Sequence, residues 1–133
     1  MANGSGLMDG ARARTRWLLV IAYVALIFTL SSIPGLQIPG TFVYRDKVAH
    51  VLEYGGLGWL LWRAAAATWP AAAKPLRAAL IVLAASALGA ADERYQAGIP
   101  GRDSSAYDWM ADTVGASLAQ VWCAAREKRG EDA

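Results

Sequence analysis

The sequence predicts an all-α, polytopic membrane protein in which four transmembrane helices form a compact bundle. The first observation is composition: 56% of the residues are apolar and 18% are charged, against about 45–50% and about 25% in soluble domains. A soluble domain of 133 residues has too little interior to bury this much apolar surface. The second observation is that the apolar residues fall into four segments separated by turn-rich stretches. The third is that basic and acidic residues gather at opposite ends of these segments.

The four apolar segments define one membrane domain. A helix needs about 20 residues to cross a hydrocarbon core of ~30 Å at ~1.5 Å per residue. We expect helices at about 17–33, 47–67, 76–94 and 107–125. We expect a disordered basic arm over residues 1–16, the four-helix domain over 17–125 and a charged tail over 126–133.

The first segment needs to be distinguished from a cleaved signal peptide. Residues 17–33 carry no charge and follow Arg12, Arg14 and Arg16, a pattern that secretory signals share. The run is longer than a usual signal core, it ends in SSIPG instead of an Ala-x-Ala site, and further apolar segments follow it. These features favour a helix that is retained in the protein.

The second and fourth segments carry acids, which lowers their hydropathy. Glu53, Asp108 and Asp112 lie within the first two turns of their expected helices. A charge at a helix centre costs ~2.5–3.5 kcal/mol on insertion scales, and the cost falls towards an interface. Both segments therefore still count as transmembrane helices.

The basic residues predict the orientation of the bundle. Nine of the 13 lysines and arginines lie on the side of the two termini, and such residues mark the cytoplasmic side of a membrane. We therefore expect both termini in the cytoplasm. These nine residues are Arg12, Arg14, Arg16, Arg63, Lys74, Arg77, Arg126, Lys128 and Arg129.

The acidic residues follow the opposite pattern. Seven of the 11 acids belong to the outer half of the bundle. Several lie inside apolar helices, where ionisable groups usually face a bundle interior or a wet cavity and pair with one another. The seven are Asp46, Glu53, Asp92, Glu93, Asp103, Asp108 and Asp112.

Helical spacing brings these polar residues together. Asp46, His50 and Glu53 lie at i, i+4 and i+7, and Asp108 and Asp112 lie at i and i+4, so each set shares one helix face. The expected ligand-binding residues are Asp46, Lys47, His50, Glu53, Tyr54, Asp92, Glu93, Gln96, Arg102, Ser104, Asp108 and Asp112. The candidate acid/base groups among them are His50, Glu53 and Glu93.

Three roles fit this set. In the first, the carboxylates pair with Lys47, Arg94 and Arg102 and serve only to hold the bundle together. In the second, carboxylates and one imidazole bind a divalent cation such as Ca²⁺, Mg²⁺, Mn²⁺ or Zn²⁺. In the third, Lys47 and Arg102 bind the phosphate or carboxylate of a lipid headgroup or envelope precursor, beside His50 as a binding or acid/base group. No other cofactor is expected.

The sequence leaves open whether the protein is an enzyme. Ser104 or Ser105 is a candidate nucleophile beside His50, but a hydroxyl in this position is more often a turn or helix cap. Nucleic-acid binding has no support, because the basic residues are scattered at helix ends. Transport is the weakest interpretation, since four short helices lack the inverted repeats of many transporters, although an oligomer could compensate.

Tryptophans and glycines have expected structural roles. Trp59 and Trp62 are assigned to packing, and Cys123 is read as a packing residue near a helix end. Small residues allow close helix approach in membranes, and we expect this of Gly55, Gly56, Gly58 and Gly115. Trp17, Trp69 and Trp109 are expected at membrane interfaces, where amphipathic rings are favoured.

Three stretches of the chain resemble the VanZ-like family of small membrane proteins. They are SSIPG (31–35), DKVAHVLEYGGLGWLL (46–61) and DERYQAGIPGRDSSAYDWMADTVGA (92–116). In place of the Asn-Thr-x-Gly that such proteins often show, this chain has Asp112-Thr113-Val114-Gly115. The positions that match the family's polar residues are Asp46, Lys47, His50, Tyr54, Asp92, Glu93, Gln96, Arg102 and Asp108.

The resemblance implies a functional context. Members of this family are associated with reduced susceptibility to glycopeptide antibiotics, teicoplanin in particular. It implies a multi-pass protein of the bacterial plasma (inner) membrane, with membrane lipids and a lipid-linked cell-wall precursor or glycopeptide as partners. The leading expectation is an outward-facing pocket that binds such a ligand. The alternatives are a membrane enzyme acting on an envelope lipid through His50, and a structural or partner-binding protein.

Overall fold

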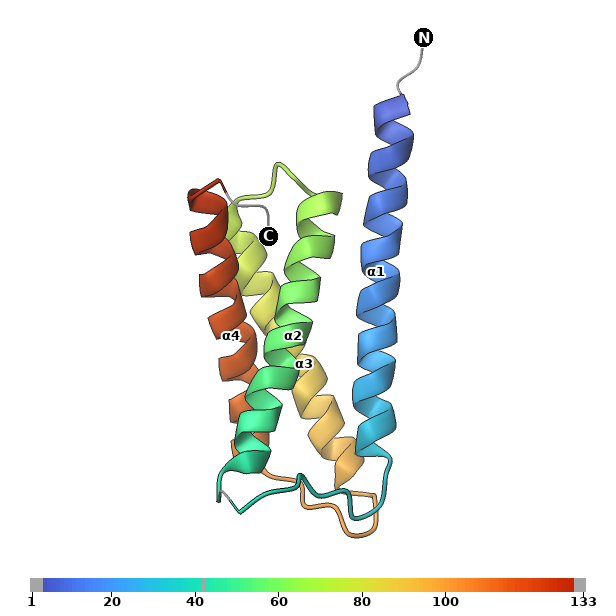
Figure 1. The fold of residues 1–133 in the computed structure, drawn as a ribbon, viewed down its shortest axis with the longest axis vertical. Helices are drawn as coiled ribbons and strands as arrows, with labels where there is room; N and C mark the ends of the chain where they lie inside the picture. The colour runs from blue at the N-terminus through green and yellow to red at the C-terminus, as the bar shows by residue number, and fades with distance from the viewer. Residues whose placement is uncertain (1–3, 42, 131–133) are drawn as a thin grey trace.

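The computed structural model describes residues 4–41 and 43–130 and shows four helices arranged side by side (Figure 1). They are α1 (Gly4–Ser31), α2 (Arg45–Thr68), α3 (Lys74–Gln96) and α4 (Ala106–Lys128). No strand occurs among the described residues, so the all-α prediction is confirmed. Successive helices run in opposite directions, which places the start of α1 and the end of α4 at the same end of the bundle.

The expected boundaries hold for three helices and fail for the first. α2, α3 and α4 begin and end within three residues of the predicted positions. The predicted disordered arm is wrong for residues 4–16, which already belong to α1. Alanine and arginine are good helix formers, and adding residues to an existing helix is much easier than nucleating one. Residues 1–3 of that arm and 131–133 of the tail lie outside the described residues.

Two of the helices have the length and composition of membrane spans. Within the described part of the chain, these are Gly10–Ser31 and Lys74–Gln96. α2 and α4 alternate with them along the chain and carry the ionisable residues expected from the sequence: His50 and Glu53 on α2, Asp108 and Asp112 on α4.

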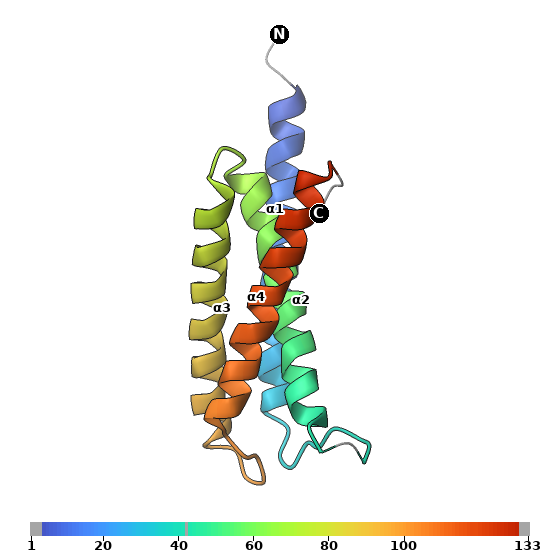
Figure 2. The same cartoon turned by 90° about the vertical axis from the view of Figure 1, so that its left-hand side faces the viewer.

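α2 is the central helix of the bundle and packs against all three others, most extensively against α4 (Figure 2). Its buried side is formed by Tyr54, Leu57, Leu61 and Trp62. α1 packs mainly on α2, where the Tyr23 hydroxyl donates to the Glu53 carbonyl oxygen at 3.0 Å.

Close approach of α2 and α4 depends on small residues, as the sequence indicated. A Cβ placed on Gly115 would lie 2.2 Å from the carbonyl oxygen of Val51, and one on Gly58 would lie 3.2 Å from the Ala116 Cα. The backbones of the two helices are therefore in contact. This contact lies next to the polar residues of both helices.

A second polar network ties the helices together at the end where α4 finishes. Glu127 accepts hydrogen bonds from Trp62 Nε1 (2.9 Å) and from Arg77 Nη2 (2.9 and 3.1 Å to its two oxygens), and it pairs with Lys74 at 3.0 Å. The Arg77 guanidinium also stacks 4.0 Å above the Trp62 ring. Trp62 was expected to have a packing role only, so its hydrogen bond corrects that expectation.

Gly115→Ala should destabilise the bundle, because the added Cβ forces α2 and α4 apart. Overpacking of this kind costs about 1–3 kcal/mol. Thermal unfolding of the purified protein in detergent measures the effect. Gly55→Ala is the matched control: its Cβ would make an ordinary 3.5 Å contact with the Gly115 carbonyl oxygen and should leave the midpoint nearly unchanged. Equal midpoints for the two variants would contradict the backbone contact.

Glu127→Gln should destabilise the protein in a pH-dependent way. Burial raises the pKa of Glu127, but its bonds with Lys74 and Arg77 outweigh this, so that the pKa is lower than the usual 4.5. A carboxyl group whose pKa is lower in the folded than in the unfolded protein stabilises the fold at a pH above its unfolded pKa. This stabilisation is lost as the pH falls through its folded pKa. The difference in unfolding temperature between wild type and Glu127→Gln should therefore be largest near pH 7 and shrink below about pH 4. A constant difference would contradict the ion pairs.

Candidate functional site

The first turns of α2 and α4 and the last turns of α3 lie at the end of the bundle opposite the start of α1 (Figure 1), and polar residues of these turns lie close together. An open cavity of about 660 Å³ lies there, between the α1–α2 loop, α2 and the α3–α4 loop. This volume is within the roughly 300–1,000 Å³ that is usual for small-molecule sites. Its charged and polar lining includes Arg45, Asp46, Lys47, His50, Glu53, Gln96, Arg102, Asp103 and Asp108.

Two pairs of side chains, one helical turn apart, join α2 to α4. A hydrogen bond of 2.8 Å links Nδ1 of His50 to Oδ1 of Asp112. The Lys47 ammonium bonds to Asp108, and to Asp46 at 2.8 Å. Lys47 and His50 are three residues apart on α2, and Asp108 and Asp112 are four apart on α4, so the two pairs lie one above the other.

The pairs differ in their exposure to solvent. Asp112 is fully buried and Asp108 is 5% exposed, whereas the Asp46 side chain is half-exposed. The hydrogen bond from Lys47 lowers the pKa of Asp46. Lys47 thus joins an exposed carboxylate at the mouth of the cavity to a buried one on α4.

α3 brings two further acids to the same level. Glu93 Oε2 accepts a 2.8 Å hydrogen bond from the backbone N–H of Ser105, which fixes the α3–α4 loop against the helix. Asp92 Oδ2 accepts from Gln96 Nε2 at 2.8 Å, and the same amide donates to Ser31 Oγ at 3.1 Å. This chain of bonds ties the end of α1 to α3.

Several buried oxygens at this end have no hydrogen-bond partner among the described residues. They are Tyr54 Oη, Asp92 Oδ1, Glu93 Oε1 and Asp112 Oδ2. Buried polar groups in proteins are nearly always hydrogen-bonded to protein or water, so each of these oxygens has capacity for a ligand, an ion or a water molecule. Three of the four belong to carboxylates.

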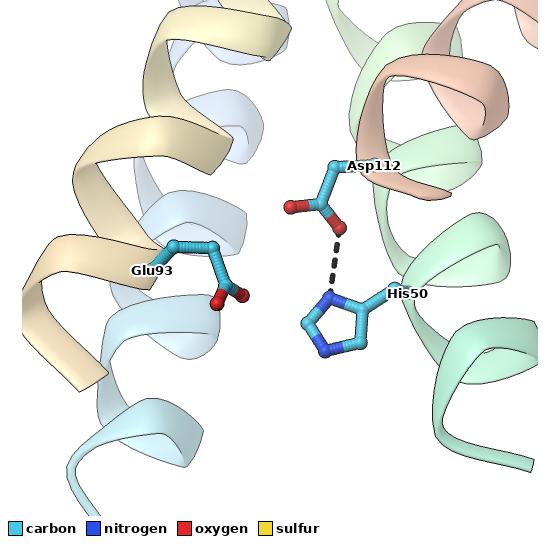
Figure 3. Close-up of side chains that lie close together, drawn as sticks. All are labelled: His50, Glu93 and Asp112. Carbon is cyan, nitrogen blue, oxygen red and sulfur yellow. Dashed lines mark hydrogen bonds and ion pairs between the residues drawn. The ribbon is translucent and has the colours of Figure 1, made fainter. Parts of the chain in front are cut away.

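His50, Glu93 and Asp112 converge from three different helices (Figure 3). Each offers one potential ligand atom, and the three atoms lie within 4.8 Å of one another. Glu93 and Asp112 are buried and His50 is half-buried. Among the described residues, this is the group that could hold a metal ion.

The twelve residues expected to bind a ligand occupy one region but not one surface. Ser104 is exposed in the α3–α4 loop. A deeper layer behind the cavity wall is formed by Tyr54, Asp92, Glu93 and Asp112. The cavity itself is lined by Asp46, Lys47, His50, Glu53, Gln96, Arg102 and Asp108.

Two expectations about individual partners are corrected. Arg94 and Arg102 were candidates to pair with the carboxylates, yet neither makes an ion pair within 4.0 Å among the described residues. Arg102 Nη1 instead donates to the Leu36 carbonyl oxygen at 3.1 Å.

Ser105 is the N-cap of α4, where its hydroxyl accepts from the Tyr107 N–H at 3.1 Å, so the cap interpretation applies to it.

Sequence reasoning missed Gly89 and Ser31. A Cβ on Gly89 would lie 2.7 Å from Asp112 Oδ2, so this glycine makes room for the buried carboxylate. A glycine one turn before Asp92 and Glu93 in an otherwise alanine-rich helix was the available signal. Ser31 lies in the SSIPG motif, but nothing in the sequence points to its bond with Gln96, which is 65 residues away.

Comparison of the chain with protein-family models, with curated proteins and with solved structures gave no match. The VanZ-like resemblance described above stays a prediction based on its three motifs.

Lys47→Gln should destabilise the protein by about 1–3 kcal/mol, because it leaves the buried Asp108 carboxylate without its charged partner. Asp46→Asn is the matched control. It removes the half-exposed partner of the same ammonium and should change stability by less than about 0.5 kcal/mol. Both are measured by thermal unfolding at neutral pH. Equal destabilisation by the two substitutions would show that Lys47 does not act through Asp108.

Proposed function

We propose that the chain is a VanZ-like protein that crosses the bacterial plasma membrane four times and binds the headgroup of a lipid or envelope precursor in its outward-facing cavity. The observation that carries the proposal is that Lys47, His50, Glu53 and Arg102, which lie on α2 and on the α3–α4 loop, line one open cavity.

The distribution of side chains on α4 supports four crossings. The side of α4 that faces away from the other helices carries Met110, Val114, Leu118 and Val121, each at least half exposed. The side of α4 that faces the other helices carries the buried residues Asp108, Asp112 and Gln120. A soluble protein would place these groups the other way round, since large apolar patches are rarely left in water. An α-helix with its polar groups inside and its apolar groups outside is suited to lipid.

The other helices follow the same arrangement. α1 exposes Leu18, Ile21 and Leu26, and α3 exposes Leu80 and Leu83. Asp108 and Asp112, which lower the hydropathy of α4, are buried, and Glu53 on α2 is partly buried beside the cavity. Low hydropathy therefore does not argue against insertion of α2 and α4.

The charge distribution supports a cavity that faces outward. The basic residues Arg12, Arg14, Lys74, Lys128 and Arg129 lie at the end that contains the start of α1 and the end of α4. The positive-inside rule assigns that end to the cytoplasm. The cavity is at the other end, at the level where the headgroups of the outer leaflet lie.

The lining of the cavity suits a headgroup that contains phosphate. Lys47 and Arg102 supply N–H donors, and charged donors bind phosphate oxygens strongly. Arg102 uses one of its donors on the Leu36 carbonyl oxygen, and a guanidinium has five. Sequestering a lipid-linked precursor in this way would change its availability to a glycopeptide antibiotic such as teicoplanin.

A second candidate function is catalysis on the bound lipid. The 2.8 Å contact between His50 and Asp112 is the geometry that orients an imidazole as a general acid or base. Under this alternative, His50→Ala abolishes turnover of the lipid while the protein still folds and retains the headgroup. Unchanged turnover in that variant would exclude His50 as the acid/base group.

Arg102→Gln should weaken retention of a phosphate-containing lipid by about tenfold or more, as expected for loss of a charged hydrogen bond. Native mass spectrometry of the protein purified with a bacterial lipid extract measures retention. Arg94→Gln is the matched control, because Arg94 is exposed on the same end and does not line the cavity. Absence of retained lipid in the wild type, or equal loss in both variants, would contradict the proposal.

A further inference from the structure

Glu93 and Asp112 are buried carboxylates that each retain an oxygen without a partner. Asp112 is 0% and Glu93 is 6% exposed. Glu93 Oε2 accepts a hydrogen bond from the Ser105 N–H, and Asp112 Oδ1 is hydrogen-bonded to His50. Asp112 Oδ2 and Glu93 Oε1 have no hydrogen-bond partner among the described residues. Burying an anion without a compensating partner is strongly unfavourable, and a bound cation would compensate both carboxylates.

His50 adds a nitrogen donor to the same site. Its Nδ1 lies 2.8 Å from Asp112 Oδ1, and one ligand atom from each of His50, Glu93 and Asp112 lies within 4.8 Å of the others. Atoms bound to one metal at ~2.0–2.2 Å are separated by roughly 3.0–3.5 Å. Small side-chain rotations would bring all three groups to that spacing.

We propose that His50, Glu93 and Asp112 bind a zinc ion. An imidazole favours zinc over Ca²⁺ and Mg²⁺, which prefer oxygen ligands throughout. Three protein ligands leave one position of a tetrahedral zinc site open, as in zinc sites that bind water or substrate. His50 also lines the cavity, so the open position is reached from there.

The surroundings hold the three ligands in place. The Ser105 N–H fixes the Glu93 carboxylate. Nε2 of His50 lies 3.8 Å from Asp108 Oδ1, and Lys47 bonds to that same oxygen. A carboxylate on the far side of a ligating imidazole commonly orients it through a hydrogen bond, which here requires Nε2 to move closer to Asp108 than 3.8 Å. Gly89 leaves the space that Asp112 Oδ2 occupies.

The direct test is zinc binding by the tag-free protein in detergent after removal of metals with a chelator. Calorimetric titration with Zn²⁺ should give one site per chain. X-ray absorption at the zinc edge of the loaded wild type should show one imidazole and oxygen ligands at ~2.0–2.2 Å. Absence of stoichiometric binding, or a zinc spectrum without an imidazole, would overturn the proposal. Stoichiometric Mn²⁺ binding without zinc binding would equally overturn the assignment to zinc.

Matched substitutions identify the ligands. Glu93→Gln and Asp112→Asn keep the shape of the side chain and should each weaken zinc binding by about 10–100-fold or more. Glu53→Gln is the control, since Glu53 lines the cavity but is not one of the three ligands. Equal affinity in all variants, with circular dichroism showing that they fold, would exclude this site. The titrations contain no lipid extract, so their outcome does not depend on whether the cavity binds a headgroup.

Discussion

The hydrogen bond between His50 and Asp112 depends on how closely α2 and α4 approach each other. Because Gly115 has no side chain, its backbone can lie against the Val51 carbonyl group. His50 is next to Val51 and Asp112 lies one turn before Gly115, so the two side chains reach across the interface and meet at 2.8 Å. The pairing of Lys47 with Asp108 repeats the same contact one turn nearer the helix ends.

This interface also explains why the acids are tolerated inside the bundle. Each buried carboxylate of α4 has a nitrogen partner on α2, so neither is an isolated charge. Glu93 on α3 is less well satisfied, since its Oε1 has no hydrogen-bond partner among the described residues. The resulting excess of buried carboxylate oxygen is the physical basis for the zinc proposal.

At the other end of the bundle, Glu127 joins α2, α3 and α4 through Trp62, Arg77 and Lys74, so both ends of the three-helix core are fixed by polar contacts.

Much of the fold follows from local pattern. Four apolar segments gave the number of helices, and the spacing of Asp46, His50 and Glu53 placed them on one face, where they line one cavity. The extension of α1 to Gly4 was not predicted, because a polar, glycine-containing arm is ambiguous between helix and coil. The close contact at Gly115 was anticipated from the clustering of small residues.

The individual partners could not be predicted. Helical spacing shows which residues share a face, but not which acid on α4 meets His50, since that depends on the relative shift of two helices. The bond from Arg102 to Leu36 depends on the path of two loops. The partners of Glu127 depend on how far α4 continues beyond residue 125, where the apolar pattern ends. Gly89 matters only because Asp112 of another helix packs against it.

In the proposed topology the chain crosses the membrane four times with its polar cavity outside. Single cysteines introduced into a Cys123→Ala background test it in intact bacterial cells with a membrane-impermeant maleimide. We expect Gly98→Cys, in the α3–α4 loop, to be labelled from outside. Ala71→Cys, in the α2–α3 loop, should be labelled only after permeabilisation, and Leu118→Cys, on the outer face of α4, should resist labelling in both conditions. Labelling of both loops from the same side, or ready labelling at position 118, would contradict this topology.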